Sequence, residues 1–115
     1  MNKLVDPHNF LWFVWDAPQL SKTAGESISD PDNRIFLSIA SVWEIAIKVS
    51  IGKLTLAEPL EDFIVNQLSR SNIQLLPILL PHLHKVASLP FHHKDPFDRL
   101  IIAQSLVEKM PVVSR

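Results

Sequence analysis

The chain has 115 residues and a mass of 13.1 kDa, which is the size of one ordinary domain. Apolar residues make up 47% and charged residues 20%, a composition that excludes a disordered chain. A formal net charge of −1 excludes binding to nucleic acid by overall basicity, and the absence of cysteine excludes disulfides, thiolate metal sites and cysteine nucleophiles. A chain without thiols is compatible with a reducing cytoplasm, and we expect this location.

Apolar periodicity, caps and breakers predict strands that alternate with helices along the chain. The predicted strands cover residues 3–6, 34–37, 73–78 and 110–114. The predicted helices cover residues 8–15, 22 to about 30, 39–51, 60–71, 80–89 and 96–109. Strands separated by helices imply crossover connections and a parallel sheet with helices on both faces. We therefore predict one three-layer α/β/α domain over residues 1–115, with a short central parallel sheet.

Two acidic residues are candidates for a functional site within this arrangement. Asp6 ends the first predicted strand, and ligands bind beyond the carboxyl ends of the strands in open parallel sheets. Glu44 lies with Ser41 and Lys48 in a narrow polar stripe on helix 39–51, which we predict to be mostly buried. A carboxylate on such a helix is either paired or used. The pairing alternative is an ion pair with Lys48, four residues along the helix.

Two further acids open the helix 96–109. Asp95 has the position of an N-cap, followed by Pro96 at the first helical position, and Asp98 has the third position of a capping box. A structural cap explains Asp95 without any catalysis. Asp98 lies on the first turn and is able to project towards the carboxyl edge of the sheet, where it would meet Asp6 and Glu44.

Three carboxylates in one pocket repel one another unless a cation neutralises them. Oxygen ligands without sulfur suit Mg²⁺ or Mn²⁺ better than zinc. A hard divalent ion held by acids is suited to hydrolysis of phosphodiesters by an activated water. The acids Asp6, Glu44 and Asp98 therefore indicate a metal-dependent nuclease or phosphatase.

Three segments resemble one known family in order and spacing. They are Leu-Val-Asp-Pro-His at 4–8, Ser-Val-Trp-Glu-Ile-Ala-Ile-Lys at 41–48, and the segment 92–104 with its Asp-Pro-Phe-Asp-Arg. These segments resemble the PIN-domain family, and the branch that is most similar is the VapC toxins of type II toxin–antitoxin modules.

The resemblance implies a PIN-like fold and a Mg²⁺- or Mn²⁺-dependent endoribonuclease that cleaves RNA. It assigns catalysis and metal binding to Asp6, Glu44 and Asp98, with Asp95 as a neighbour that is an optional further ligand. It also implies a homodimer and silencing by a VapB-type antitoxin. The apolar run 10–15 is expected to contact one of these two partners.

Two departures from the family pattern leave an alternative open. The family site is often completed by a fourth acid just after the last strand, where this chain ends at Arg115, and Pro7 replaces a common threonine. The chain is then either a piece of a longer protein or a degenerate member. The alternative function is a catalytically impaired module that binds antitoxin or RNA without cleaving it.

Basic residues near the acids are candidates for holding RNA phosphates. Lys48, Lys94 and Arg99 have this role in our interpretation, although ordinary solvated ion pairs explain them equally well. His8 is better explained as a histidine at the start of a helix than as a substrate contact. A zinc site at His92 and His93 is disfavoured, because adjacent histidines rarely bind one ion and no further ligand has the required spacing.

Overall fold

The computed structural model describes residues 1–91 and 95–113. In this part of the chain, four strands form one parallel sheet in the order β3-β2-β1-β4, and six helices surround it. The strands are β1 (Asn2–Val5), β2 (Arg34–Ser38), β3 (Gln74–Leu76) and β4 (Val112–Val113). The helices are α1 (Pro7–Val14), α2 (Lys22–Ser29), α3 (Ile39–Ser50), α4 (Leu60–Ser71), α5 (Leu80–Ser88) and α6 (Pro96–Glu108). The predicted α/β fold with a parallel sheet is confirmed.

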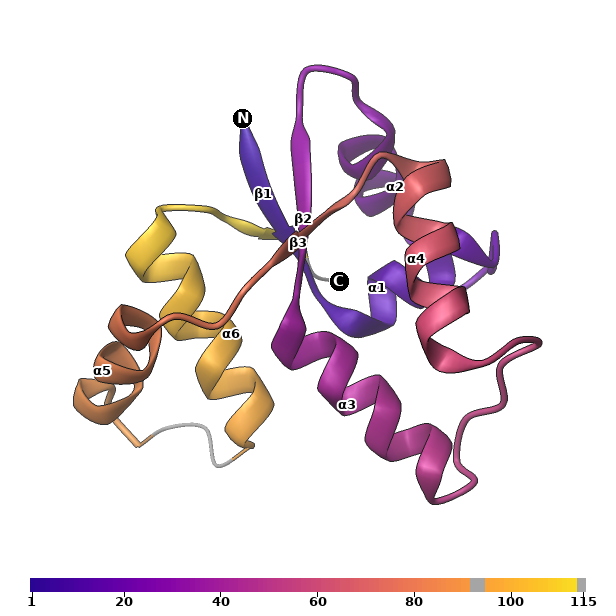
Figure 1. Ribbon diagram of the computed structural model, residues 1–115. Coiled ribbons are helices and arrows are strands. Elements are labelled where there is room, and N and C mark those ends of the chain that lie inside the picture. The colour runs from indigo at the N-terminus through magenta and orange to yellow at the C-terminus, as the bar shows by residue number, and fades with distance from the viewer. Residues whose placement is uncertain (92–94, 114–115) are drawn as a thin grey trace.

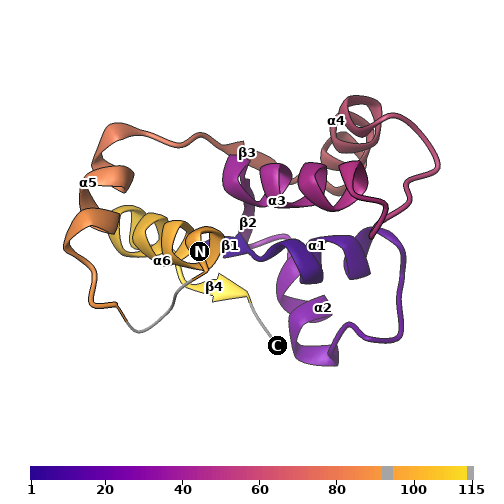
Figure 2. The same cartoon turned by 90° about the horizontal axis from the view of Figure 1, so that it is seen from below.

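Side chains that alternate along the strands build a core on each face of the sheet. Val5, Leu37 and Val113 belong to the larger core, which α1, α2, α3 and α4 cover. Leu4 belongs to the smaller core, together with Ile101 of α6. Figures 1 and 2 show α5 and α6 on one side of the sheet and α1, α2 and α4 on the other. This is the predicted three-layer α/β/α arrangement.

Two strands pass directly into helices at the carboxyl edge of the sheet. Asp6 follows β1 in an extended conformation, and its carboxylate accepts a hydrogen bond from the Asn9 N–H at 2.7 Å, which caps α1. Ser38 ends β2 and caps α3, since its Oγ accepts from the Ala40 N–H at 3.0 Å. β1 therefore ends at Val5, one residue before the predicted end.

The predicted elements are all present, with ends that differ by a few residues. β3 stops at Leu76 because Pro77 has no N–H for the ladder. The helix predicted to reach Ile51 ends one residue earlier, and Gly52 follows with a φ of 76°. β4 is shorter than predicted, and the predicted end of that strand at Ser114 lies outside the described residues.

The prediction that helix 39–51 is mostly buried is wrong. Ala40, Ser41 and Ile45 are buried, but Trp43 is 54% exposed and Ile51 is 59% exposed. The physical reason is that α3 runs beyond the carboxyl edge of the sheet, so no further layer covers its outer face (Figure 1).

Burial of two other segments also differs from expectation. The amphipathic pattern of helix 96–109 predicts that Leu106 lies on its inner side, but Leu106 is 52% exposed. In the apolar run 10–15, Phe10 and Leu11 are fully in the core and Phe13 packs against it, whereas Trp15 is 44% exposed. Most of this run is therefore core, and Trp15 is its most exposed residue; its contact with a partner stays a prediction.

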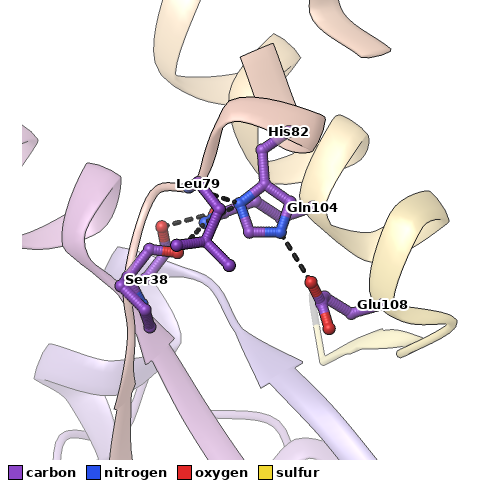
Figure 3. Close-up of polar contacts among 6 residues, drawn as sticks. Ser38, Leu79, His82, Gln104 and Glu108 are labelled. Atoms are coloured by element: carbon purple, nitrogen blue, oxygen red, sulfur yellow. Dashed lines mark hydrogen bonds and ion pairs between the residues drawn. The ribbon is translucent and has the colours of Figure 1, made fainter. Parts of the chain in front are cut away.

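A buried polar network fastens α6 to the sheet and to α3 (Figure 3). The side chain of Gln104, which has no exposed surface, accepts a hydrogen bond from the Ser38 Oγ at 2.5 Å. Its amide nitrogen donates to the Pro77 carbonyl at 3.2 Å and faces the His82 Nδ1 at 3.4 Å. Because Ser38 also caps α3, its hydroxyl connects the start of α3, the helix that carries Glu44, to the middle of α6, the helix that carries Asp98.

The same network assigns donor and acceptor roles to the two nitrogens of the buried His82 ring. Its Nδ1 faces the Leu79 N–H at 3.0 Å and the amide of Gln104, and both of these are donors. The Nδ1 is therefore an acceptor, and the Nε2–H donates to the carboxylate of Glu108 at 2.7 Å. This arrangement holds α5 against α6 (Figure 3).

Candidate active site

A pocket of about 370 Å³ lies at the carboxyl edge of the sheet, and its walls come from three separate parts of the chain. Asp6 enters from the start of α1, Glu44 from the middle of α3, and Asp95 and Asp98 from the start of α6. The topology explains this meeting, because β1 and β2 are adjacent and parallel and α3 contacts α6. All four predicted acids therefore line one pocket.

Local structure holds three of these carboxylates in place. Asp6 caps α1, as described above, and Asp95 caps α6 by accepting hydrogen bonds from the N–H groups of Phe97 at 2.8 Å and Asp98 at 3.1 Å. The Glu44 side chain is only 13% exposed, and its carboxylate lies 3.2 Å from the ammonium of Lys48. These contacts orient the carboxylates without occupying all their lone pairs.

The carboxylate of Asp98 differs from the other three. Its side chain is exposed at the first turn of α6, and within residues 1–91 and 95–113 it has no hydrogen-bond or ion-pair partner. The backbone N–H groups at this helix start favour negative charge. Asp98 is therefore the acid most available for a ligand.

The pocket is acidic overall. Its four carboxylates outnumber its two lysines, Lys48 and Lys53, by two. Lys48 pairs with Glu44 and also lines the pocket, so both of its predicted roles remain compatible with its position. An anionic substrate in this pocket would need a further cation to balance the carboxylates.

The donor set of the pocket fits a hard divalent cation, because it offers carboxylate oxygens and no sulfur. Within the described part of the chain, however, no three histidine, aspartate or glutamate side chains are arranged as a metal cluster. Mg²⁺ usually binds through one or two carboxylates and keeps several waters. A pocket with acids on separate walls fits an ion held in that way.

The other predicted substrate-binding residues have different positions. The Arg99 guanidinium does not line the pocket; it donates to the carbonyls of Pro90 and Val86, each at 3.0 Å, and lies 4.8 Å from the centre of the Phe91 ring. Its role in holding RNA stays a prediction. Lys94, like the disfavoured zinc site at 92–93, lies outside the described residues.

Several residues of the pocket were not singled out from the sequence. Lys53 lines it directly after Gly52, and Phe97 lines it from within the Asp-Pro-Phe-Asp segment. The signal for Phe97 was its position between two candidate acids. Lys53 could have been found in the sequence from its position directly after Gly52, which follows the end of α3. Pro7 also lines the pocket and provides no hydroxyl there.

Ser38 and Ser41, at the start of α3, are the two hydroxyls that could replace the one that Pro7 lacks. Ser38 instead caps α3 and bonds to Gln104. Ser41 is fully buried, and its Oγ has no hydrogen-bond partner among the residues that the structure describes. Neither serine lines the pocket.

Comparison with protein families gives a match to the PIN domain over residues 3–115. The chain belongs to the PIN-domain family. Among curated relatives, this PIN domain is similar to Ribonuclease VapC16 of Mycobacterium tuberculosis, with 37% identity over 57 residues. That match covers 50% of this chain and 39% of the relative, so it spans about two fifths of the relative's length.

Solved structures support the fold of this PIN domain. The crystal structure of VapBC2 from Rickettsia felis, bound to a DNA fragment from their promoter, matches with a TM-score of 0.70. The match covers 97% of this chain and 86% of that chain at 14% identity, so it bears on the fold alone. Among the described residues, none of the helices has the length and apolarity to span a membrane.

Proposed function

We propose that this PIN domain is a VapC-like endoribonuclease that depends on Mg²⁺ or Mn²⁺ and hydrolyses RNA phosphodiester bonds. The observation that carries the proposal is the single pocket that Asp6, Glu44 and Asp98 line from distant parts of the chain. Membership of the PIN family and the local likeness to a VapC ribonuclease support it. The substrate is RNA in the cytoplasm.

In this proposal the ion would bind among Asp6, Glu44 and Asp98, through one or two of their carboxylates and its own waters, and Asp95 is a neighbour that orients the start of α6. When bound, the ion offsets negative charge on the scissile phosphate and polarises it for attack by water. Lys48 keeps the Glu44 carboxylate turned towards the pocket, because the two groups lie 3.2 Å apart on the same helix. Lys53 offers an exposed ammonium to a neighbouring phosphate.

The alternative is a binding module without cleavage. Two observations favour it: Pro7 lines the pocket where related toxins commonly have a hydroxyl, and the described residues contain no three-membered metal cluster. This alternative predicts binding to RNA or to an antitoxin that survives the loss of Glu44.

Incubation of the purified protein with a total-tRNA pool distinguishes the ribonuclease from the binding module without cleavage. We expect discrete products in Mg²⁺ or Mn²⁺, none in EDTA, and none with Asp6→Asn. Asparagine caps helices as well as aspartate, so this variant removes charge while α1 stays capped. A folded wild-type protein that yields no products, or products that persist in EDTA, contradicts the proposal.

Two macromolecular partners belong to the proposal. We infer a VapB-type antitoxin that blocks the pocket, in keeping with the fold likeness to VapBC2. We also infer a homodimer. Its candidate surface is the outer face of α5 and α6, defined by the exposed residues Leu79, Leu80, Leu83 and Leu106.

A further inference from the structure

The outer face of α3 exposes an apolar row that ends beside the pocket. Ile39, Trp43, Ile47 and Ile51 follow one another at four-residue spacing, and each is at least 37% exposed. Four-residue spacing places these side chains along one side of the helix, over a length of about 18 Å. Such a row is costly to leave in water, so it indicates a contact surface.

An aromatic pair forms the part of this row that faces α6. The indole of Trp43 and the ring of Phe97 meet edge to face, with centres 4.9 Å apart and planes at 79°. Phe97 is partly buried and supports the indole, which itself remains 54% exposed. The indole of Trp43 therefore keeps exposed aromatic surface while its contact with Phe97 fixes its orientation.

This aromatic surface is continuous with the acidic pocket. Phe97 lines the pocket and contacts Trp43, so it belongs to both. Trp43 directly precedes Glu44, and Phe97 directly precedes Asp98. Lys53 lines the same pocket. A molecule that covers the indole therefore lies beside the pocket that the candidate acids and Lys53 line.

We propose that Trp43 is a base-stacking residue, on which one unpaired base of single-stranded RNA lies while the adjoining phosphate enters the pocket. This inference rests on the proposed function and names the part of the RNA, an unpaired base, that the enzyme contacts. An aromatic face adjacent to phosphate-binding groups matches a nucleotide, which is flat and apolar at one end and anionic at the other. A duplex does not fit, because its bases are already stacked on their neighbours.

Charge distribution favours RNA over an apolar peptide as the occupant of this surface. A purely apolar partner helix would use the whole row from Ile39 to Ile51 and would gain nothing from Lys53. An RNA strand uses the aromatic pair, the lysine and the cation site together. Stacking on an aromatic side chain tolerates different bases, so this contact positions the strand and sets only a modest base preference.

The test is the equilibrium binding of a short, unstructured, fluorescein-labelled RNA, followed by anisotropy in Ca²⁺. Ca²⁺ takes oxygen ligands in place of Mg²⁺, and a gel after each titration shows that the RNA is intact. Trp43→Leu should weaken binding by about 5- to 150-fold, the loss expected for one stacked base. Trp43→Phe, which keeps an aromatic face, should restore most of the affinity.

Trp15→Leu is the matched control. Trp15 is 44% exposed and also packs against a phenylalanine, Phe63, with ring centres 6.2 Å apart, but it does not line the pocket. We expect unchanged RNA binding for this variant and no effect of Trp43→Leu on a duplex of the same sequence. Equal weakening by both variants would overturn the proposal, because it would show a nonspecific effect of removing an exposed indole.

Other outcomes separate this inference from the proposed function. RNA binding that depends on Trp43, by a protein that never cleaves, would refute the nuclease proposal and support stacking. Cleavage and binding that are both unchanged in Trp43→Leu would refute stacking and leave the nuclease standing. Loss of antitoxin binding with normal RNA binding in this variant would assign the surface to the protein partner and overturn the proposal. A wild-type protein that binds no RNA also overturns it.

Discussion

Two acids of the pocket have a structural task in addition to their proposed one. Asp6 and Asp95 each accept hydrogen bonds from the first turn of a helix, α1 and α6 respectively. Glu44 and Asp98 cap nothing, since Glu44 pairs with Lys48 and the Asp98 carboxylate has no partner among the described residues. Substitutions of Asp6 and Asp95 therefore have to separate lost helix capping from lost site chemistry.

Asp95 allows that separation. Asp95→Ala should lower the free energy of unfolding by about 1 kcal/mol, because the N–H groups of Phe97 and Asp98 lose their acceptor. Asp95→Asn should stay within a few tenths of a kcal/mol of wild type and keep most of the cleavage rate. Urea unfolding and initial cleavage rates measure the two effects. Complete loss of cleavage in a stable Asp95→Asn protein would show that Asp95 is an essential ligand.

At the scale of elements, the pocket depends on how α3 and α6 are held against the sheet. The link is the network through Gln104, which joins Ser38 at the start of α3 to the Pro77 carbonyl and the His82 ring. Buried polar groups cost stability when they lose their partners. The relative position of the two helices that carry Glu44 and Asp98 is therefore coupled to this buried amide.

Gln104→Leu should reduce the free energy of unfolding by about 2 kcal/mol, since the buried Ser38 O–H loses its acceptor and the Pro77 carbonyl loses the donor from Gln104. The matched control is Gln19→Leu, at an exposed position between α1 and α2. Chemical denaturation of both variants checks the prediction. Equal stability of Gln104→Leu and Gln19→Leu would show that the network contributes nothing to the fold.

The sequence was sufficient to predict the α/β fold and the location of the candidate acids at one edge of the sheet, because both depend on local signals. The caps at Asp6 and Asp95 are visible in the residues themselves, and parallel topology then brings the starts of their helices to one edge. Other features depend on tertiary packing. The exposure of Trp43 follows from the extension of α3 beyond the sheet, and the partners of His82 come from Leu79 and from two residues of α6, so neither was predicted from a pattern of residues.

For the whole molecule, the exposed leucines of α5 and α6 form a surface separate from the pocket. Leu80 and Leu83, together with Val107, line an apolar hollow of about 770 Å³, and none of its lining residues lines the acidic pocket. We expect a second copy of the chain to cover this surface. The acidic pockets of both copies would then remain open to RNA.

Light scattering should give a mass twice the 13.1 kDa of one chain. Leu83→Asp should yield the single-chain mass, because a buried unpaired charge is costly in an apolar interface. Val65→Asp is the control, since Val65 is exposed on α4 and does not line the hollow. A wild-type protein with the mass of one chain, or a dimer that persists in Leu83→Asp, would contradict this assignment.

The central claim is that the acidic pocket carries the ribonuclease activity, and Asp98→Asn tests it most directly. Asp98 is exposed and its carboxylate has no partner in the described part of the chain, so the substitution removes only the interaction with the helix start and should lower the free energy of unfolding by about 1 kcal/mol at most. The measurement is the initial rate of tRNA cleavage in Mg²⁺, beside the exposed control Asp62→Asn. We predict a loss of at least about 100-fold for Asp98→Asn, the scale of losing a group that stabilises transition-state charge, and none for the control. Cleavage by Asp98→Asn at the wild-type rate would contradict the account.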